Sequence, residues 1–272
     1  MVTSLHVISG LPRSGSTLLS AILQQNPRLH AGVTSPVLSL CANMLEKMGP
    51  NSEFHSFFDE ERRRRVLQGV IGAYYGSACS DRVVFDTNRN WTAKIPLLTT
   101  LYPEARIICC VRDIGWIIDS IERMLRQNPL QHSRIFGYKS GSSVYGRVET
   151  LMNSENGLVG QAWSSLREAW FGHDASRLII VRYDSLTADP HSVLNRLYKE
   201  LGEPDFDHDF DNVAFDTEAY DTSLGMPGLH RVMPAVRPND KRPCIPPDLF
   251  AKHATLSFWN KTDMNPGAAI LL

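Results

Sequence analysis

One stretch near the N-terminus decides the fold of this chain: Leu5-His6-Val7-Ile8-Ser9-Gly10-Leu11-Pro12-Arg13-Ser14-Gly15-Ser16-Thr17-Leu18-Leu19. Its apolar start is typical of a buried strand, a turn rich in Gly, Pro and Ser follows, and apolar residues then recur at helical spacing. Such a turn presents free backbone N–H groups and the positive end of the helix dipole to an anion. The stretch predicts a phosphate-binding loop from Gly10 to Gly15, with an unliganded tight turn as the alternative.

The loop differs from that of nucleotide triphosphatases at the two residues after Gly15. Those proteins carry Lys-Ser or Lys-Thr there, whereas this chain has Ser16-Thr17 and places its cation earlier, at Arg13. A kinase needs that lysine on the β- and γ-phosphates and a hydroxyl on Mg²⁺. The sequence therefore argues against transfer of a γ-phosphate.

The composition is typical of an ordinary soluble protein. The chain has 272 residues, 43% of them hydrophobic and 21% charged, which is enough for a large buried core. Its net charge of -1 argues against nucleic-acid or anionic-membrane partners but allows a local basic pocket. The five cysteines form no Cys-x-x-Cys pair, and the adjacent Cys109 and Cys110 are expected to be reduced core residues on opposite faces of a strand. We therefore expect neither a disulfide framework nor a metal site.

No leader or membrane span is visible in the sequence. The first strand is expected from about residue 5, and no apolar run approaches the ~18 residues that a span requires. Together with cysteines expected to be reduced, this predicts a cytoplasmic protein.

Apolar strands alternate with helical patterns along the chain. Beyond the first strand, strands are expected near residues 29–33, 83–85, 106–111 and 178–181. This alternation predicts an α/β fold with a central parallel sheet flanked by helices, in one domain that spans residues 1–272. Residues 127–143 are expected to form a long lid, and residues 203–272 a partly irregular wrap over the domain. The basic run Arg62 to Arg65 is expected to be a solvated helix face.

A second phosphate-binding pair is predicted where the strand at 106–111 ends. Arg112 follows that strand, and Ser120 lies eight residues later on the next helix. An arginine can hold a phosphate with paired N–H groups, and a serine two turns into the helix can reach the same oxygens. Alone the pair is weak evidence, because Arg-Asp after a strand is often only a helix start.

Three motifs together resemble one family. Pro12-Arg13-Ser14-Gly15-Ser16-Thr17-Leu18, the Arg112…Ser120 spacing and Val181-Arg182-Tyr183-Asp184-Ser185-Leu186-Thr187-Ala188-Asp189-Pro190 occur in the order seen in sulfotransferases that use 3′-phosphoadenosine 5′-phosphosulfate (PAPS). The resemblance covers about residues 5–190 and is nearest to bacterial, protein-tyrosine and glycan sulfotransferases. It implies a three-layer, P-loop-like fold. It also implies metal-free transfer of a sulfuryl group from PAPS to a hydroxyl or amine, leaving adenosine 3′,5′-bisphosphate.

The resemblance also assigns donor-binding residues. Arg13 with Ser14, Gly15, Ser16 and Thr17 would bind the 5′-phosphosulfate, and Arg112 with Ser120 would bind the 3′-phosphate. Tyr183 belongs to the third motif and is expected at the nucleotide. In the family a C-terminal cation closes over the nucleotide, and the candidates here are Arg231, Arg237, Lys241 and Arg242, of which we favour Arg237 and Lys241.

The general base is the least determined residue. Phe85-Asp86-Thr87-Asn88-Arg89 can be aligned with a Phe-Glu-Lys-Ser segment of glycan sulfotransferases, which makes Asp86 the base and Arg89 a second catalytic cation beside Arg13. Pairing with Arg89 or capping of the next helix is an equally strong interpretation of Asp86. His30 is the next candidate. His6 is expected to be a core histidine, and His132 and His230 surface histidines able to contact an acceptor.

A small-molecule metabolite is the expected acceptor, with a peptide tyrosine or a saccharide second. No nucleic acid or membrane partner is expected, and the sequence gives no indication of the oligomeric state. A P-loop small-molecule kinase and a non-catalytic nucleotide-binding protein are the competing functions. The kinase would require ATP, Mg²⁺ and a loop lysine, and the non-catalytic protein would tolerate loss of phosphate motifs that here stand intact.

Overall fold

Six parallel strands form the central sheet of this computed structural model, which describes residues 4–76, 81–127, 143–238, 242–261 and 269–272. The strand order is β2-β3-β1-β4-β5-β6, so the chain first builds one side of β1 and then crosses to the other. The loop after β1 therefore opens between the carboxyl ends of its neighbours β3 and β4, where open α/β sheets bind ligands. The bounds are β1 Ser4–Gly10, β2 Leu29–Ala31, β3 Val83–Thr87, β4 Ile107–Val111, β5 Leu178–Arg182 and β6 Ile270–Leu271.

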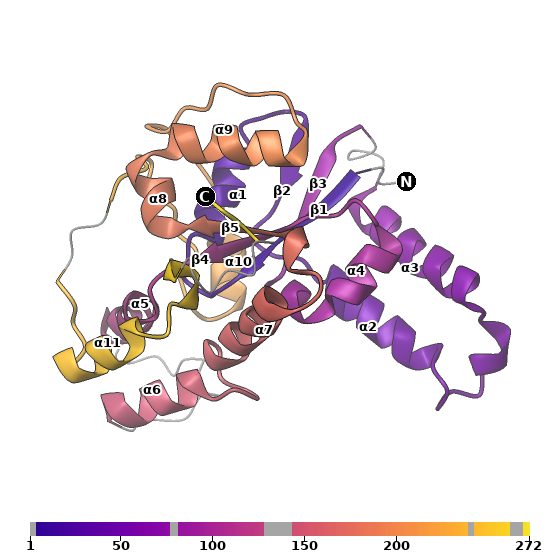
Figure 1. Ribbon diagram of the computed structural model, residues 1–272, viewed down its shortest axis with the longest axis horizontal. Coiled ribbons are helices and arrows are strands. Elements are labelled where there is room, and N and C mark those ends of the chain that lie inside the picture. The colour runs from indigo at the N-terminus through magenta and orange to yellow at the C-terminus, as the bar shows by residue number, and fades with distance from the viewer. Residues whose placement is uncertain (1–3, 77–80, 128–142, 239–241, 262–268) are drawn as a thin grey trace.

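Helices cover both faces of the sheet, so the expected three-layer α/β fold is confirmed (Figure 1). Alternate strand residues enter opposite cores, and Cys109 and Cys110 lie on opposite faces as expected. One core packs against α2 Val37–Lys47, α3 Glu60–Tyr75, α4 Ile95–Leu101, α5 Ile114–Gln127, α6 Val144–Met152, α7 Gly160–Phe171 and α11 Pro247–Ala254. The other packs against α1 Ser16–Leu23, α8 Tyr183–Ala188, α9 Pro190–Leu201 and the segment that includes α10 Glu218–Ser223.

Local capping explains where helices begin. Asp59 accepts a hydrogen bond from the Arg62 N–H at 2.7 Å and so starts α3, and Asp189 accepts one from the Ser192 N–H at 3.1 Å at the start of α9. Pro190 is the first residue of α9, a position that suits proline because its fixed φ is already helical. Short 3₁₀ helices occur at η1 His55–Phe57, η3 Arg89–Lys94, η5 Ala175–Arg177 and η6 Phe258–Asn260.

The C-terminal region is more regular than the expected wrap. It contains α10 and α11, and β6 pairs in parallel with β5 through Ile179 and Ile270. Both α10 and β6 are too short to leave a periodic pattern in the sequence. Most of the lid expected at residues 127–143 lies outside the described residues.

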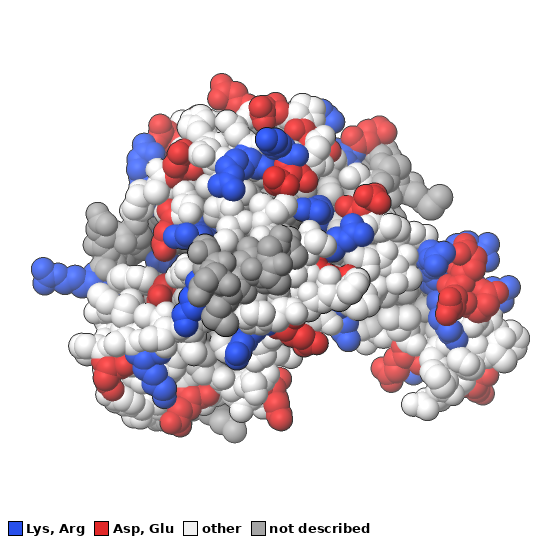
Figure 2. All heavy atoms as spheres, viewed as in Figure 1, with Lys and Arg blue, Asp and Glu red and all other residues white. Residues whose placement is uncertain are grey.

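The α2–η1–α3 hairpin projects beyond the sheet (Figure 1). Basic and acidic side chains mix at the end of this projection (Figure 2), where Arg64 lies 3.0 Å and Arg65 3.9 Å from Glu61. The arginine run is thus a solvated helix face, as expected. Among the described residues, no helix has the length and apolarity needed to cross a membrane.

Gly10 allows the loop after β1 to lie directly on β4. Its φ is +100°, and a Cβ at this position would lie 2.3 Å from the Cys110 carbonyl oxygen. The same carbonyl accepts the Leu11 N–H at 2.9 Å. Any side chain at position 10 would push the loop away from the sheet.

We expect Gly10→Ala to lower the free energy of unfolding by about 2–5 kcal/mol, since both a left-handed backbone and an overpacked contact oppose it. Gly69→Ala is the matched control. Gly69 lies within α3 with nothing within 4 Å of an added Cβ, so its replacement should raise stability by about 0.5–1 kcal/mol. Urea unfolding measures both, and equal effects would contradict the close-contact role of Gly10.

Candidate functional site

A cavity of about 1270 Å³ lies at the carboxyl ends of β1, β3 and β4. Its walls come from the loop after β1, the end of β3, α5, the α6–α7 region, the start of α8 and residues 220–238. None of the described residues that line it is Asp, Glu or Lys. Five arginines line it, and they make the cavity strongly positive in a protein of net charge -1: Arg13, Arg89, Arg112, Arg231 and Arg237.

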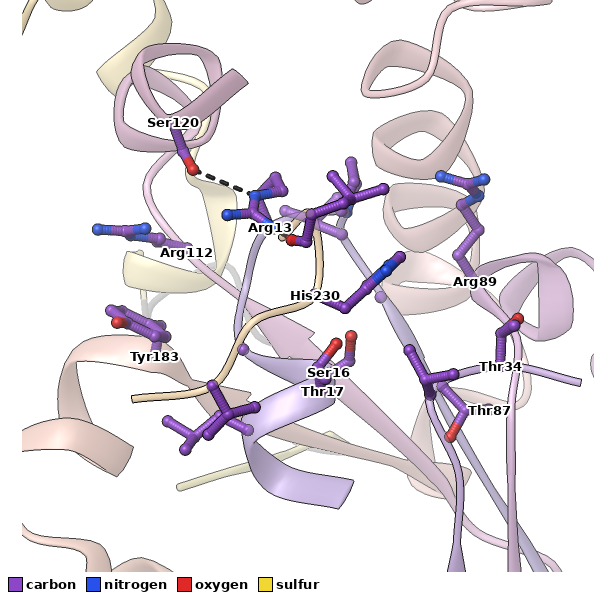
Figure 3. A pocket seen from close by; sticks show the side chains of 18 of the residues that line it. Arg13, Ser16, Thr17, Thr34, Thr87, Arg89, Arg112, Ser120, Tyr183 and His230 are labelled. Carbon is purple, nitrogen blue, oxygen red and sulfur yellow. Dashed lines mark hydrogen bonds between the residues drawn. The ribbon is translucent and has the colours of Figure 1, made fainter. Parts of the chain in front are cut away.

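The loop ends in a helix start that is open to an anion. Gly15 caps α1 with φ 93°, and no side chain caps the first turn. The first intrahelical bond runs from the Leu19 N–H to the Gly15 carbonyl at 2.9 Å, so the amides of Ser16 and Thr17 precede it. Both residues line the cavity at its floor (Figure 3). The first turn of α1 thus leaves free the two amides that the expected phosphate cradle would use.

Ser14 has a different place from the one expected. Its side chain is buried, and its hydroxyl donates to the carbonyl oxygens of Leu11 and of Cys110, the latter at 2.8 Å. Ser14 is not among the residues that line the cavity. The hydroxyl holds the loop onto β4 and is not directed at a ligand.

Arg13 connects the loop to two other parts of the chain. Its φ of 58° turns the side chain out of the loop. Its Nε donates to the Ser120 hydroxyl of α5 at 3.2 Å, and its guanidinium also donates to the Leu229 carbonyl (Figure 3). Burial, together with the nearby charge of Arg112, lowers the pKa of Arg13. Ser120 thus accepts a hydrogen bond from Arg13, while the family resemblance assigns it to the 3′-phosphate beside Arg112.

Arg112 rests on an aromatic side chain. Its guanidinium carbon lies 4.3 Å from the centre of the Tyr183 ring and 5.9 Å from that of Trp116. The Tyr183 ring also supports the loop, because a Cβ on Gly15 would lie 2.8 Å from it. The buried Nε of Arg112 has no hydrogen-bond partner among the described residues. This donor is therefore free to bond to water or to a ligand in the cavity.

The remaining expected cations are divided between wall and rim. Arg89 lies across the cavity from Arg112 (Figure 3), and burial lowers its pKa. Arg237 lines the cavity, but its exposed guanidinium pairs with Asp211 at 2.5 Å. Lys241 lies outside the described residues, and Arg242 is not among the residues that line the cavity.

Asp86 lies outside the cavity, contrary to the expectation that it faces the acceptor. Its carboxylate is fully buried and accepts hydrogen bonds from Ser35, Tyr75 and the Trp91 indole N–H. Strand alternation explains the error, since Thr87 faces the cavity and Asp86 therefore points to the opposite side of β3. Asp86 neither pairs with Arg89 nor caps a helix. Its hydrogen bonds connect β3 to the residues before α2, to the end of α3 and to η3.

The histidines also differ from expectation in one case. His6 is a core residue, as expected, whose Nδ1 accepts the Arg106 N–H at 3.1 Å. His30 lies in β2 and does not line the cavity, and His132 lies outside the described residues. His230, expected at the surface, lines the cavity. It bonds to Asp221, a partner nine residues away that no motif in the sequence indicates.

Comparison with known proteins identifies one family and two solved structures of similar fold. The sequence profile of the sulfotransferase family matches residues 7–208. The sulfotransferase domain from the curacin biosynthetic pathway is 18% identical and has a TM-score of 0.52, over 98% of this chain and 93% of that one. A sulfotransferase from Alicyclobacillus acidocaldarius is 14% identical with a TM-score of 0.51, over 83% of this chain and 92% of that one. At these identities the two structures show a shared fold alone. No curated protein matches the chain.

We expect Asp86→Asn to destabilise the protein, because the amide would turn a donor toward side chains that donate to the carboxylate. The free energy of unfolding should fall by about 2–4 kcal/mol. Tyr75→Phe removes one donor and leaves the carboxylate with two, so it should cost only about 1 kcal/mol. Urea unfolding of both variants tests this order, and an unchanged stability in Asp86→Asn would refute the structural role.

Proposed function

The chain belongs to the sulfotransferase family, and from this premise we propose that it moves a sulfuryl group from PAPS to a hydroxyl, or an amine, of a small metabolite. Family membership makes the protein a transferase. The donor class rests on one observation: an uncapped helix start and the arginines Arg13, Arg89 and Arg112 line one cavity that no described carboxylate lines. A doubly phosphorylated nucleotide suits such a site.

The phosphosulfate end of the donor would bind at the loop. Ser16 and Thr17 offer their amides, with hydroxyls beside them at the cavity floor. Arg13 offers a guanidinium whose Nε bonds to Ser120 and which also bonds to the Leu229 carbonyl. These are fixed donors, and fixed donors stabilise a developing charge better than mobile water does.

The 3′-phosphate would bind at Arg112. The buried, unpartnered Nε of Arg112 and the Ser120 hydroxyl both belong to the same side of the cavity (Figure 3). The Tyr183 ring beneath the guanidinium restricts its orientation, which lowers the entropy lost on binding. The residues present therefore fit a nucleotide with two separated phosphates.

When bound, PAPS supplies a sulfuryl group on a phosphate leaving group. The chain must then neutralise charge on the leaving phosphate and align the acceptor with the sulfur. We assign the first task to Arg13, and we assign contact with the sulfuryl oxygens to Arg89 on the opposite wall (Figure 3).

The acceptor side of the cavity supports a small neutral substrate. Besides the arginines, apolar and uncharged polar side chains line the cavity, among them Val33, Thr34, Asn88, Leu158, Gln161 and Leu224. A radiolabelled PAPS assay with 2-naphthol, benzyl alcohol, a tyrosine peptide and a monosaccharide tests the acceptor class. Transfer to the peptide or sugar alone would replace the metabolite with one of those acceptors.

We expect adenosine 3′,5′-bisphosphate to bind far more tightly than AMP, because Arg112 would contact the 3′-phosphate. Arg112→Ala should weaken the bisphosphate by roughly 10–100-fold and leave AMP nearly unchanged, as for loss of a charge-assisted pair. Arg126→Ala is the control, since Arg126 is exposed, pairs with Glu122 and lies outside the cavity. Calorimetry measures all three proteins, and equal affinity of wild type for the two nucleotides would refute the two-phosphate site.

We expect transfer to proceed in EDTA at an undiminished rate. Ser16 stands where a kinase loop carries its lysine, and arginines supply the charge that Mg²⁺ would supply to a kinase. Initial rates with PAPS, with and without EDTA, test this. A strict requirement for Mg²⁺, with ATP as the donor, would favour the kinase.

A further inference from the structure

We propose that His230, oriented by Asp221, is the general base that takes the proton of the acceptor hydroxyl. This inference rests on the proposed sulfuryl transfer, and it assigns to His230 the role that the sequence assigned to Asp86. His230 is the residue that touches the acceptor, and Asp221 is a positioning residue that acts through it.

His230 is in the right place for this role. Its side chain enters the cavity above Ser16 and Thr17, between Arg13 and Arg89 (Figure 3). We assign these four residues to the phosphosulfate, so the acceptor oxygen would bond to sulfur in the space between them.

The composition of the lining leaves few other bases. No Asp, Glu, Lys or Cys is found among the described residues that line the cavity, and His230 is the one histidine among them. Tyr183 and Tyr220 also line it, but the Tyr183 ring lies against the Arg112 guanidinium and no carboxylate bond to either hydroxyl is found among the described residues. A neutral imidazole is the ordinary proton acceptor at neutral pH.

Asp221 holds His230 by two contacts. One carboxylate oxygen of Asp221 lies 2.6 Å from His230 Nδ1, and the other accepts the His230 backbone N–H at 2.9 Å. The Asp221 carboxylate is 1% exposed, so its position is fixed by the surrounding fold. A carboxylate bonded to Nδ1 keeps the proton on that nitrogen and leaves Nε2 free to accept another.

The chain between the two residues is a compact turn. The Met226 N–H donates to the Asp221 carbonyl at 3.0 Å, and the Leu229 N–H donates to the Met226 carbonyl at 3.1 Å. Arg13 bonds to the Leu229 carbonyl and so ties this turn to the phosphate loop. Asp221 therefore holds the imidazole, and Arg13 holds the backbone that precedes it.

Burial and three charged side chains set the protonation state of His230, namely Asp221, Arg13 and Arg89. Burial lowers its pKa, the hydrogen bond and charge of Asp221 raise it, and the charges of Arg13 and Arg89 lower it. The Tyr220 ring packs 5.4 Å away. The net direction is a lowered pKa, so His230 is neutral at pH 7 and able to accept a proton. The base is lost on the acid side, where Nε2 becomes protonated.

His230 Nε2 takes the hydroxyl proton as the acceptor oxygen bonds to sulfur. The bond from sulfur to the 5′-phosphate oxygen breaks, and its electron pair stays on that phosphate. The products are the sulfate ester, adenosine 3′,5′-bisphosphate and an imidazolium that Asp221 stabilises, and the imidazolium then returns its proton to water.

The first experiment removes the base. In His230→Gln we expect single-turnover transfer from PAPS to benzyl alcohol to fall roughly 10²–10⁴-fold, while adenosine 3′,5′-bisphosphate binds normally by calorimetry. The defect should be much smaller with 4-nitrophenol, which ionises readily without a base. His173→Gln is the control, because the His173 side chain is fully exposed. Circular dichroism confirms folding, and imidazole should partly restore His230→Ala.

The second experiment tests the contact between Asp221 and His230 without a catalytic assay. The His230 ring resonance is followed by NMR from about pH 4 to pH 8 in ligand-free wild type and Asp221→Asn. Loss of the carboxylate removes the interactions that raise the pKa, so the midpoint should move to lower pH. An unchanged or higher midpoint would overturn the role of Asp221.

The outcomes separate the two proposals. If wild type transfers sulfate and folded His230→Gln transfers it equally well to benzyl alcohol, His230 is not the base and the proposed function stands. If wild type neither binds adenosine 3′,5′-bisphosphate nor transfers, the proposed function fails, and the catalytic role of His230 fails with it.

Discussion

The contact between the loop after β1 and the carbonyl of Cys110 is the constraint on which the site depends. That carbonyl accepts both the Leu11 N–H and the Ser14 hydroxyl, and it leaves no room for a side chain at Gly10. With the loop fixed on β4, Arg13 is turned toward α5 and the first turn of α1 faces the cavity. One carbonyl oxygen of the sheet thus sets the position of the phosphate cradle.

The fold and the phosphate loop follow from local sequence, whereas the base does not. A strand, a Gly-rich turn and a helix of fixed spacing determine the cradle within some fifteen consecutive residues, as the stretch from Leu5 to Leu19 shows. The Arg112–Tyr183 stack needs the pairing of β4 with β5, which sequence spacing does not reveal. His230 reaches the cavity because residues 220–238 close it, and no hydrophobic period predicts that path.

Asp86 shows that a shift of one position along a strand decides whether a side chain lines the cavity or is buried on the other face. Thr87 shares its strand end with Asp86 but faces the cavity, because successive side chains alternate between faces. The Asp86 carboxylate instead accepts hydrogen bonds from Ser35 before α2, from Tyr75 of α3 and from Trp91 of η3, and so ties the end of β3 to all three segments. An acid at a strand end is therefore evidence for a site only when the face it occupies is known.

Residues 220–238 connect the phosphate loop to the proposed base His230. Arg13 bonds to the carbonyl of Leu229, and the next residue is His230, whose imidazole is held by Asp221. The arginine assigned to the donor thus also fixes the backbone that carries the base. Catalysis needs donor and base to be aligned within a fraction of an ångström. Two side chains hold the turn at Leu229 and His230, although it is neither helix nor strand. Arg13 is itself fixed by its hydrogen bond to Ser120, and Asp221 is fixed because it is buried.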